Sequence, residues 1–397
     1  MYDDLTCDYN KSLSANILVV GKSGVGKSSL LNYLFDKEVE KTGSGFPVTD
    51  YGVYRHEYQY DEQFKVNIYD SWGLEAGRAD KWRKMLIDKV HEHDRMEINE
   101  WFNTIIYCTS VVADRFEDFE INIINELREK KNNVIVAITH CKSEDDEKAI
   151  NFRNERICPQ TGLKEDDVVL VSSVQKKLIS GTETVRFGKE RIFKMIIRNL
   201  WRTFKEKLTY NVQYGVNERF DHYRKSMESI IDDGLSSILF RKNDLDNVFK
   251  DINLQLDALF DELPKITNDK YKDAYDYYDA LSVKYCSIGS LGKYIDKGKL
   301  KNNIRSFKPS NSFKQKAKET LKKIDQKTKL NMSEKNKMVE FVEKLHVGLS
   351  TSKTIKKELL EYVGKYYDEL EKVFKISLDE IEAYLEELDI EEIYNVE

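Results

Sequence analysis

The sequence predicts an α/β domain with a mostly parallel sheet, followed by an all-α region. In the first half, short apolar runs alternate with longer helix-like stretches, an alternation typical of a parallel sheet covered by helices. After about Gly188 the strand patterns fade, and apolar residues recur at helical spacing instead. Only four of the 397 residues are proline, which favours long helices in the second half.

Several predicted strands are nearly continuous apolar runs, as expected for strands covered on both faces. The predicted strands are residues 16–20, 52–60, 64–69, 104–109, 134–139 and 168–172. They place the α/β domain at residues 14–205, after an N-terminal extension at residues 1–13. Residues 206–397 are predicted to form the helical domain.

Two apolar stripes at helical spacing indicate a bundle-like helical domain. The first comprises Leu245, Phe249, Ile252, Leu256 and Phe260, and the second Ile355, Leu359, Val363, Tyr366, Leu370 and Val373. Ser377 and Glu380 have the spacing of a capping box, which predicts a last helix that begins there.

Charge is unevenly spread over the helical domain. Residues 293–337 hold 15 Lys or Arg against four acids, whereas residues 358–397 hold 14 acids against three lysines. We therefore expect a basic segment at 293–337 and an acidic C-terminal helix. Two interpretations of the basic segment remain open: a solvated helical face, or a surface for phospholipid or nucleic acid.

The five cysteines include no Cys-x-x-Cys pair, and their number is odd. This pattern argues against a disulfide framework or a zinc site and favours a reducing compartment. No apolar run approaches the roughly 20 residues of a membrane span, and residues 1–11 lack the apolar core of a signal peptide. We expect a cytoplasmic protein, with peripheral membrane association left open.

A phosphate-binding loop is predicted at residues 21–28, which read Gly-Lys-Ser-Gly-Val-Gly-Lys-Ser between a buried strand and a helix. The glycines let successive backbone N–H groups point at phosphates, and the helix N-terminus adds its positive dipole end. Lys27 would neutralise the β- and γ-phosphates, and the Ser28 hydroxyl would bind Mg²⁺. The motif therefore predicts a Mg²⁺-dependent nucleotide site.

Two further segments would complete the metal side of this site. Asp70 ends a predicted strand and would hold Mg²⁺ through water, while the N–H of Gly73 could reach the γ-phosphate. Thr49 lies in a loop rich in Gly and Pro, where a threonine hydroxyl can bind Mg²⁺ and close the loop over the γ-phosphate. Thr42 is the alternative threonine.

These motifs resemble those of the translation-factor-related P-loop GTPases, and most closely the Era-like, dynamin-like and interferon-inducible branches. The resemblance covers residues 14–205 and implies GTP and GDP as ligands, with Ser172 and Ser173 flanking the base. The candidate nucleotide-binding residues are Gly21, Lys22, Ser23, Gly24, Val25, Gly26, Lys27, Ser28, Ser29, Asp70, Gly73, Thr139, His140, Ser172 and Ser173. The catalytic candidates are Lys27 and Thr49, and the metal-ligand candidates are Ser28, Thr49 and Asp70.

The base-reading motif departs from this family at Lys142, which stands where an Asp accepts hydrogen bonds from guanine. An ammonium group has only donors and cannot replace that carboxylate. His140 could stack on the base, as a lysine stem does in relatives. An acid that follows could replace the missing Asp, or the site is permissive; these acids are Glu144, Asp145 and Asp146. GTP specificity is thus implied by the resemblance, and an ATPase is an alternative.

The leading hypothesis is a GTP-hydrolysing switch or assembly protein whose helical domain responds to the γ-phosphate. It includes nucleotide-dependent homo-oligomers and dynamin-like association with a membrane. The competing hypothesis is a regulatory binding module that recruits a protein or RNA partner in one nucleotide state.

Basal GTP hydrolysis is expected to be slow and to rise with protein concentration. Leu74 occupies the position where some GTPases carry a glutamine that orients the attacking water, and leucine cannot do so. An arginine from the same chain or from a neighbouring molecule can add roughly 10³ to 10⁵ in rate, and the candidates are Arg55, Arg78, Arg83 and Arg115. The measurement is turnover per site over a wide range of protein concentrations. A fast rate that does not depend on concentration would show that one molecule holds the complete catalytic group.

Overall fold

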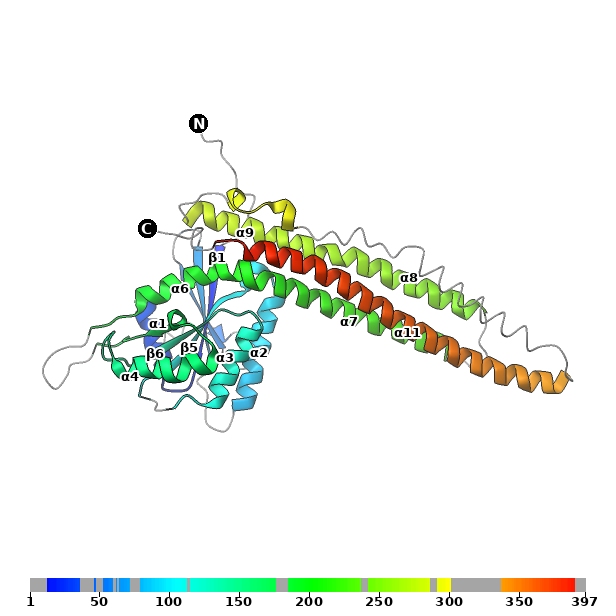
Figure 1. Ribbon diagram of the computed structural model, residues 1–397, viewed down its shortest axis with the longest axis horizontal. Coiled ribbons are helices and arrows are strands. Elements are labelled where there is room, and N and C mark those ends of the chain that lie inside the picture. Colours follow the sequence, from blue (N-terminus) through cyan, green and yellow to red (C-terminus); the bar gives the residue numbers. More distant parts are fainter. Residues whose placement is uncertain are drawn as a thin grey trace, which may run out of the picture. The chain divides into compact units, whose positions relative to one another are not determined.

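The computed structural model describes most of the chain (Figure 1), and the chain divides into two compact units. Described are residues 13–35, 46–47, 53–59, 62, 64–71, 79–112, 115–175, 185–236, 242–285, 291–300 and 337–389. The first unit comprises Met1–Asn211, Lys272–Lys297 and Tyr384–Glu397, and the second comprises Val212–Tyr271 and Gly298–Ala383.

The first unit contains a mixed sheet whose described strands are ordered β2-β3-β4-β1-β5-β6-β7. The strands are β1 (Leu13–Gly21), β2 (Phe46–Pro47), β3 (Val53–Gln59), β4 (Phe64–Ser71), β5 (Phe102–Ser110), β6 (Val134–Thr139) and β7 (Val168–Leu170). Strands β4, β1, β5, β6 and β7 run parallel, and β2 and β3 pair antiparallel at one edge. The predicted α/β class with a mostly parallel sheet is confirmed, and each predicted strand is present.

Apolar side chains alternate between the two faces of the sheet and build a core on each. Strands β1, β5 and β6 are buried along their whole length, because helices cover both faces. The helices against one face are α2 (Ala79–Arg95), α3 (Asp118–Glu129) and α4 (Glu147–Phe152), and those against the other are α1 (Lys27–Phe35) and α6 (Lys189–Arg202). Shorter elements are η1 (Ile98–Glu100), η2 (Arg153–Ile157), α5 (Cys158–Thr161), η3 (Glu165–Asp167) and η4 (Thr203–Lys207).

Long helices form the remainder of the described chain, as predicted. They are α7 (Leu208–Gly234), α8 (Lys242–Pro264), η5 (Lys265–Asp269), α9 (Lys270–Tyr285) and α11 (Lys337–Glu386), with 3₁₀ turns at η6 (Leu291–Lys293) and η7 (Lys297–Leu300). The second unit has a core of its own, in which Phe220 of α7 contacts Tyr367 and Phe374 of α11. At the end of α7, a Cβ on Gly234 would lie 2.2 Å from Val248 of α8, so the helices approach closely there.

Two details of the predicted helices are wrong. The predicted helix start at Ser377 is absent, because α11 continues through it and the buried Phe374, Leu378 and Ile381 extend one apolar stripe. A capping box has no function where the backbone stays helical on both sides. The second predicted stripe is confirmed at the buried Leu359, Val363 and Leu370, but it is wrong at Val373, which is 38% exposed, and Tyr367 is buried in place of Tyr366.

The first unit includes segments that are predicted from the sequence to belong to the helical domain. The Tyr277 hydroxyl of α9 donates to the Ser14 carbonyl at 2.5 Å, and the Tyr278 ring lies against Phe204 with centroids 4.7 Å apart. Lys205 donates to the carbonyls of Glu386 and Leu388 at 2.6 and 2.9 Å. The compact unit therefore extends beyond residues 14–205 to include much of α9 and the end of α11.

Of the basic segment 293–337, only residues 293–300 and Lys337 lie within the described part of the chain. Among the described helices, none has the length and apolar character that crossing a membrane requires.

Candidate functional site

The phosphate loop begins where β1 ends against β5. Gly21 pairs with Cys108 of β5, and a Cβ on Gly21 would lie 2.3 Å from the Cys108 carbonyl oxygen. Only glycine tolerates that approach, so β5 fixes the point at which the chain leaves the sheet. The loop ends at Gly26, whose φ is +95° and whose carbonyl accepts the first α1 hydrogen bond from Leu30. Strand β1 and helix α1 therefore hold the loop from both ends.

The Lys27 side chain folds back under this loop. Its Nζ donates to the carbonyls of Gly21 and Lys22 at 3.1 and 3.0 Å, and the residue is buried. A cation held by two loop carbonyls lies at the concave side of the backbone, where phosphate oxygens would add further acceptors. The positive charge is thus in place before any anion binds.

Lys22 anchors the same loop to helix α3. Its ammonium lies 2.8 Å from Glu120 and 3.1 Å from Glu117, and it lies over the Phe119 ring. Burial lowers the pKa of Lys22, but the hydrogen bonds and charges of the two carboxylates outweigh burial and raise it. Lys22 therefore stays charged.

Glu120 is the buried centre of this anchor. Only 1% exposed, it accepts hydrogen bonds from the Tyr107 hydroxyl at 3.0 Å and from the Glu117 N–H at 3.0 Å. Burial, and after it the Glu120 charge and hydrogen bond, raise the pKa of Tyr107 well above its usual value, so Tyr107 remains a donor. A carboxylate buried this deeply needs its cation, which makes the link from α3 to the loop costly to break.

The candidate metal ligands that the structure describes lie near the carboxyl ends of two neighbouring strands, β4 and β1. Asp70 lies near the end of β4, in register with Val19 of β1, and Ser28 follows Lys27 in α1. A hydroxyl and a carboxylate are the oxygen donors that Mg²⁺ prefers. Thr49, Gly73 and Leu74, like the alternative Thr42, lie outside the described residues, so their roles stay predictions.

Thr139 and His140, which are predicted to lie near the base, stand at the carboxyl end of β6. The Thr139 hydroxyl lies within hydrogen-bonding distance of the Val25 carbonyl at 2.5 Å, which ties the end of β6 to the phosphate loop. His140 has a left-handed φ of +61°, and its Nδ1 lies 2.9 Å from the Ser110 hydroxyl. The His140 ring is also 3.4 Å from the position of a Cβ on Gly26. The strained backbone of His140 therefore directs its ring beside the loop.

The acids after Lys142 have different roles. Asp146 is the N-cap of α4, and its carboxylate accepts from the backbone N–H groups of Lys142, Lys148 and Ala149 at 2.9, 3.2 and 3.4 Å. Because its carboxylate already accepts from three backbone N–H groups, Asp146 is poorly suited to accept hydrogen bonds from guanine as well. Glu144 instead lines a cavity of about 720 Å³ together with Phe187.

That cavity adjoins the fifth motif. Ser172 and Phe187 exchange backbone hydrogen bonds at 3.2 and 3.1 Å, and the Cys141 N–H donates to Val171 at 3.2 Å. The loops after β6 and β7 are therefore joined, and Ser173 follows directly. The described candidates from the phosphate loop, β4, β6 and the residues after β7 all lie at the carboxyl ends of parallel strands, the usual ligand edge of such sheets.

Sequence reasoning missed Glu120 and Tyr107. Glu117 and Glu120 have capping-box spacing, but nothing in the sequence links them to Lys22, because only the fold brings α3 beside the loop. Ser110 was missed for the same reason.

Comparison with known proteins decides the class of this domain. Residues 16–140 match the family model described as 50S ribosome-binding GTPase. This part of the chain is a P-loop GTPase domain. The match spans the phosphate loop, Asp70 and the start of the base-reading motif.

Solved GTPase structures show further similarity. The G domain of the T. maritima FeoB iron transporter is 18% identical, with 47% of this chain and 98% of that chain covered and a TM-score of 0.30. Arabidopsis thaliana Toc33 with GDP and Mg²⁺ is 17% identical, with 47% of this chain and 84% of that chain covered and a TM-score of 0.34. A probable GTP-binding protein EngB is 19% identical, with 46% of this chain and 98% of that chain covered and a TM-score of 0.32. Similarity at this level says nothing about what this chain binds. A search among curated proteins finds no match.

Replacing Lys22 with methionine is expected to weaken GDP and GTP binding roughly tenfold, or ~1.4 kcal/mol. The loss of its ammonium leaves Glu120 without its cation and frees the loop from α3. Lys22→Arg should bind almost as well as the wild type, because it keeps the charge. The measurement is fluorescent-nucleotide titration, with thermal melts as a check on folding.

A double variant separates anchoring from general damage. Glu120→Gln removes the stranded charge, so it should recover part of the affinity lost in Lys22→Met. Unchanged nucleotide affinity in Lys22→Met would contradict a positioning role for Lys22.

Proposed function

We propose that this protein is a Mg²⁺-dependent switch that binds and hydrolyses GTP and passes its γ-phosphate state to the helical region. The observation that carries the proposal is the phosphate loop with Lys27 held beneath it, inside a segment that matches a GTPase family. Phosphoryl transfer depends on positioning and charge neutralisation more than on covalent chemistry of the protein. A loop clamped by β5, α1 and α3 is suited to that task.

Each described residue has a specific part in this scheme. Lys27 neutralises the β- and γ-phosphates, and Lys22 fixes the loop carbonyl that Lys27 contacts. Ser28 and Asp70 would hold Mg²⁺, which when bound neutralises charge that develops on the phosphates. Thr49 and Gly73 would respond to the γ-phosphate, as proposed from their motifs.

Guanine recognition is assigned to the loops after β6 and β7. His140 would stack on the base, since its ring lies beside Gly26. Glu144 is our candidate for the missing acceptor, because Asp146 caps α4 while Glu144 faces the cavity beside the fifth motif. An anionic acceptor at that point would favour guanine over adenine, since guanine offers two donors and adenine offers an acceptor at the matching position.

The output of the switch would run through helices that belong to both units. The chain passes from the first unit to the second within α7, and it returns within α9 and α11. A ligand shifts such a system only through contacts that differ between two states, and the γ-phosphate supplies such a difference. Nucleotide-dependent self-association, or recruitment of a membrane or protein partner, is the output that we propose for the helical region.

GTP is expected to outcompete ATP by at least about tenfold, or ~1.4 kcal/mol, in displacing a fluorescent guanine nucleotide. Glu144→Gln should reduce that preference because it removes the anionic acceptor, whereas the matched control Asp145→Asn should keep it. Lys27→Ala should lose both nucleotides while the fold survives. Equal competition by GTP and ATP in the wild type would mean that the site is not guanine-specific.

A further inference from the structure

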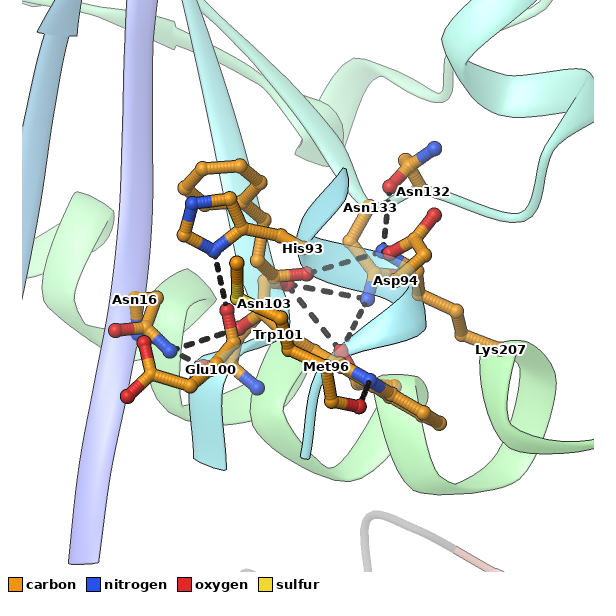
Figure 2. A network of polar contacts seen from close by, with 12 residues as sticks. Asn16, His93, Asp94, Met96, Glu100, Trp101, Asn103, Asn132, Asn133 and Lys207 are labelled. Carbon is orange, nitrogen blue, oxygen red and sulfur yellow. Dashed lines mark hydrogen bonds and ion pairs between the residues drawn. The ribbon is translucent and has the colours of Figure 1, made fainter. Parts of the chain in front are cut away.

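A lysine is completely buried near the amino ends of β5 and β6, whereas the phosphate loop lies at the carboxyl end of β1. Lys207, the last residue of η4, is 0% exposed, and its ammonium lies 2.6 Å from Asp94, near the end of α2 (Figure 2). The same ammonium donates to the Asn132 side chain at 2.7 Å and approaches the Phe102 carbonyl at 3.5 Å. Burying a charge is costly unless it is paired, so these partners hold Lys207 in one position.

Neutral side chains hold the other end of η4. The Asn133 amide lies within hydrogen-bonding distance of the Thr203 hydroxyl at 3.0 Å and of the Asn199 and Asn103 carbonyls at 3.1 and 3.2 Å. The Thr203 hydroxyl in turn donates to the Asn199 carbonyl at 2.8 Å. The π-helical turn η4 is thus fixed at Thr203 and at Lys207, directly before α7 begins at Leu208. Such turns often occur at functional positions in long helices.

Helix α2 connects this network to the nucleotide side. The helix begins at Ala79, in the segment that follows Asp70 and Gly73 in the chain. At its other end, the His93 ring stacks on Phe102 with centroids 4.2 Å apart and meets Tyr69 edge-on at 4.9 Å. Tyr69 directly precedes Asp70, and His93 directly precedes Asp94. The end of α2 therefore contacts both the strand that carries Asp70 and the lysine that precedes α7.

The His93 ring makes this contact as a neutral group. Its Nδ1 donates to the Glu100 carbonyl at 2.7 Å, and burial lowers the pKa of His93 below its usual 6.5. Lys89 lowers it further, whereas the Glu100 hydrogen bond and the charges of Glu92 and Asp94 oppose the shift. Asp94, directly after His93, and Lys207 are both buried, and their charges face each other.

We propose that α2 and the Asp94–Lys207 pair transmit the nucleotide state from Asp70 to the foot of α7. This inference rests on the proposed switch function and names the contact that carries it. A packed helix moves as a rigid rod, so a shift at its start on γ-phosphate loss displaces Asp94 at its end. Lys207 follows, because separating the pair would leave Asp94 without its cation and Lys207 with neutral partners only. Since Lys207 ends η4, the displacement enters α7 directly.

The test compares wild type with the double variant Asp94→Leu/Lys207→Met. Apolar replacements of similar size avoid a stranded charge and commonly preserve the fold. Hydrogen exchange is measured for residues 212–271 of the full chain with GDP and with a non-hydrolysable GTP analogue, alongside fluorescent-nucleotide affinity. We expect wild type to show a difference between the two states, and the double variant to bind nucleotide normally but lose that difference.

A control removes an ion pair of helix α6, which precedes η4. Arg198 of α6 lies 2.6 Å from Asp167, which belongs to η3 and not to α2. Arg202 lies 3.3 Å from the same carboxylate and is 26% exposed, so it can be solvated when Asp167 is replaced. Asp167→Leu/Arg198→Met should therefore keep the exchange difference. Should the first double variant fail to fold, Asp94→Asn/Lys207→Met keeps the shape of the Asp94 side chain while it removes both charges, and it should reduce the difference.

The outcomes distinguish a failure of the proposed switch from a failure of the role given to the Asp94–Lys207 pair. No exchange difference in wild type would overturn the proposed switch itself, whatever the pair does. A difference in wild type that persists in full in the folded, nucleotide-bound double variant, or in Asp94→Asn/Lys207→Met where that variant replaces it, would overturn the role of the pair. Equal loss in the Asp167/Arg198 control would also overturn it, because any loosening of α6 would then suffice.

Discussion

The arrangement of this protein depends on one constraint, the confinement of β1 between β4 and β5. The strand is buried along its whole length and pairs in parallel with both neighbours, so it cannot shift without breaking two ladders. It ends at Gly21 against the Cys108 carbonyl, where no side chain fits. The phosphate loop, Asp70 on β4 and the Thr139 contact to Val25 all take their positions from this central strand.

Two charge networks, one partly and one fully buried, extend that constraint to the surrounding helices. At the carboxyl edge of the sheet, Lys22 and Glu120 tie the phosphate loop to α3. At the amino edge, Asp94 and Lys207 tie α2 to the foot of α7. Buried ion pairs add little net stability compared with apolar packing, yet removing one partner is strongly destabilising. In the proposed switch, such a pair would make two helices move together, because separating it leaves buried charges without their partners.

The sequence is sufficient to predict the parts that rest on local pattern. Continuous apolar runs predict the buried strands, and Gly-x4-Gly-Lys-Ser between a strand and a helix predicts the phosphate loop. Contacts between distant segments are not predictable in this way. Lys207 resembles an ordinary lysine of a polar helix, and Asp146 resembles a base-reading acid until its α4 cap is seen. Ser377 has the pattern of a helix start, but tertiary packing keeps α11 helical through it.

The central proposal is that the second unit changes its position relative to the first unit when the γ-phosphate is lost. The direct measurement is the distance distribution between two spin labels, one at Asn122→Cys on α3 and one at Lys225→Cys on α7, with Cys7, Cys158 and Cys286 replaced by serine. Both labelled positions are exposed, and they lie in different units. The account predicts that the distribution shifts between the GDP and GTP-analogue states. Identical distributions, with nucleotide binding verified in both samples, would contradict it.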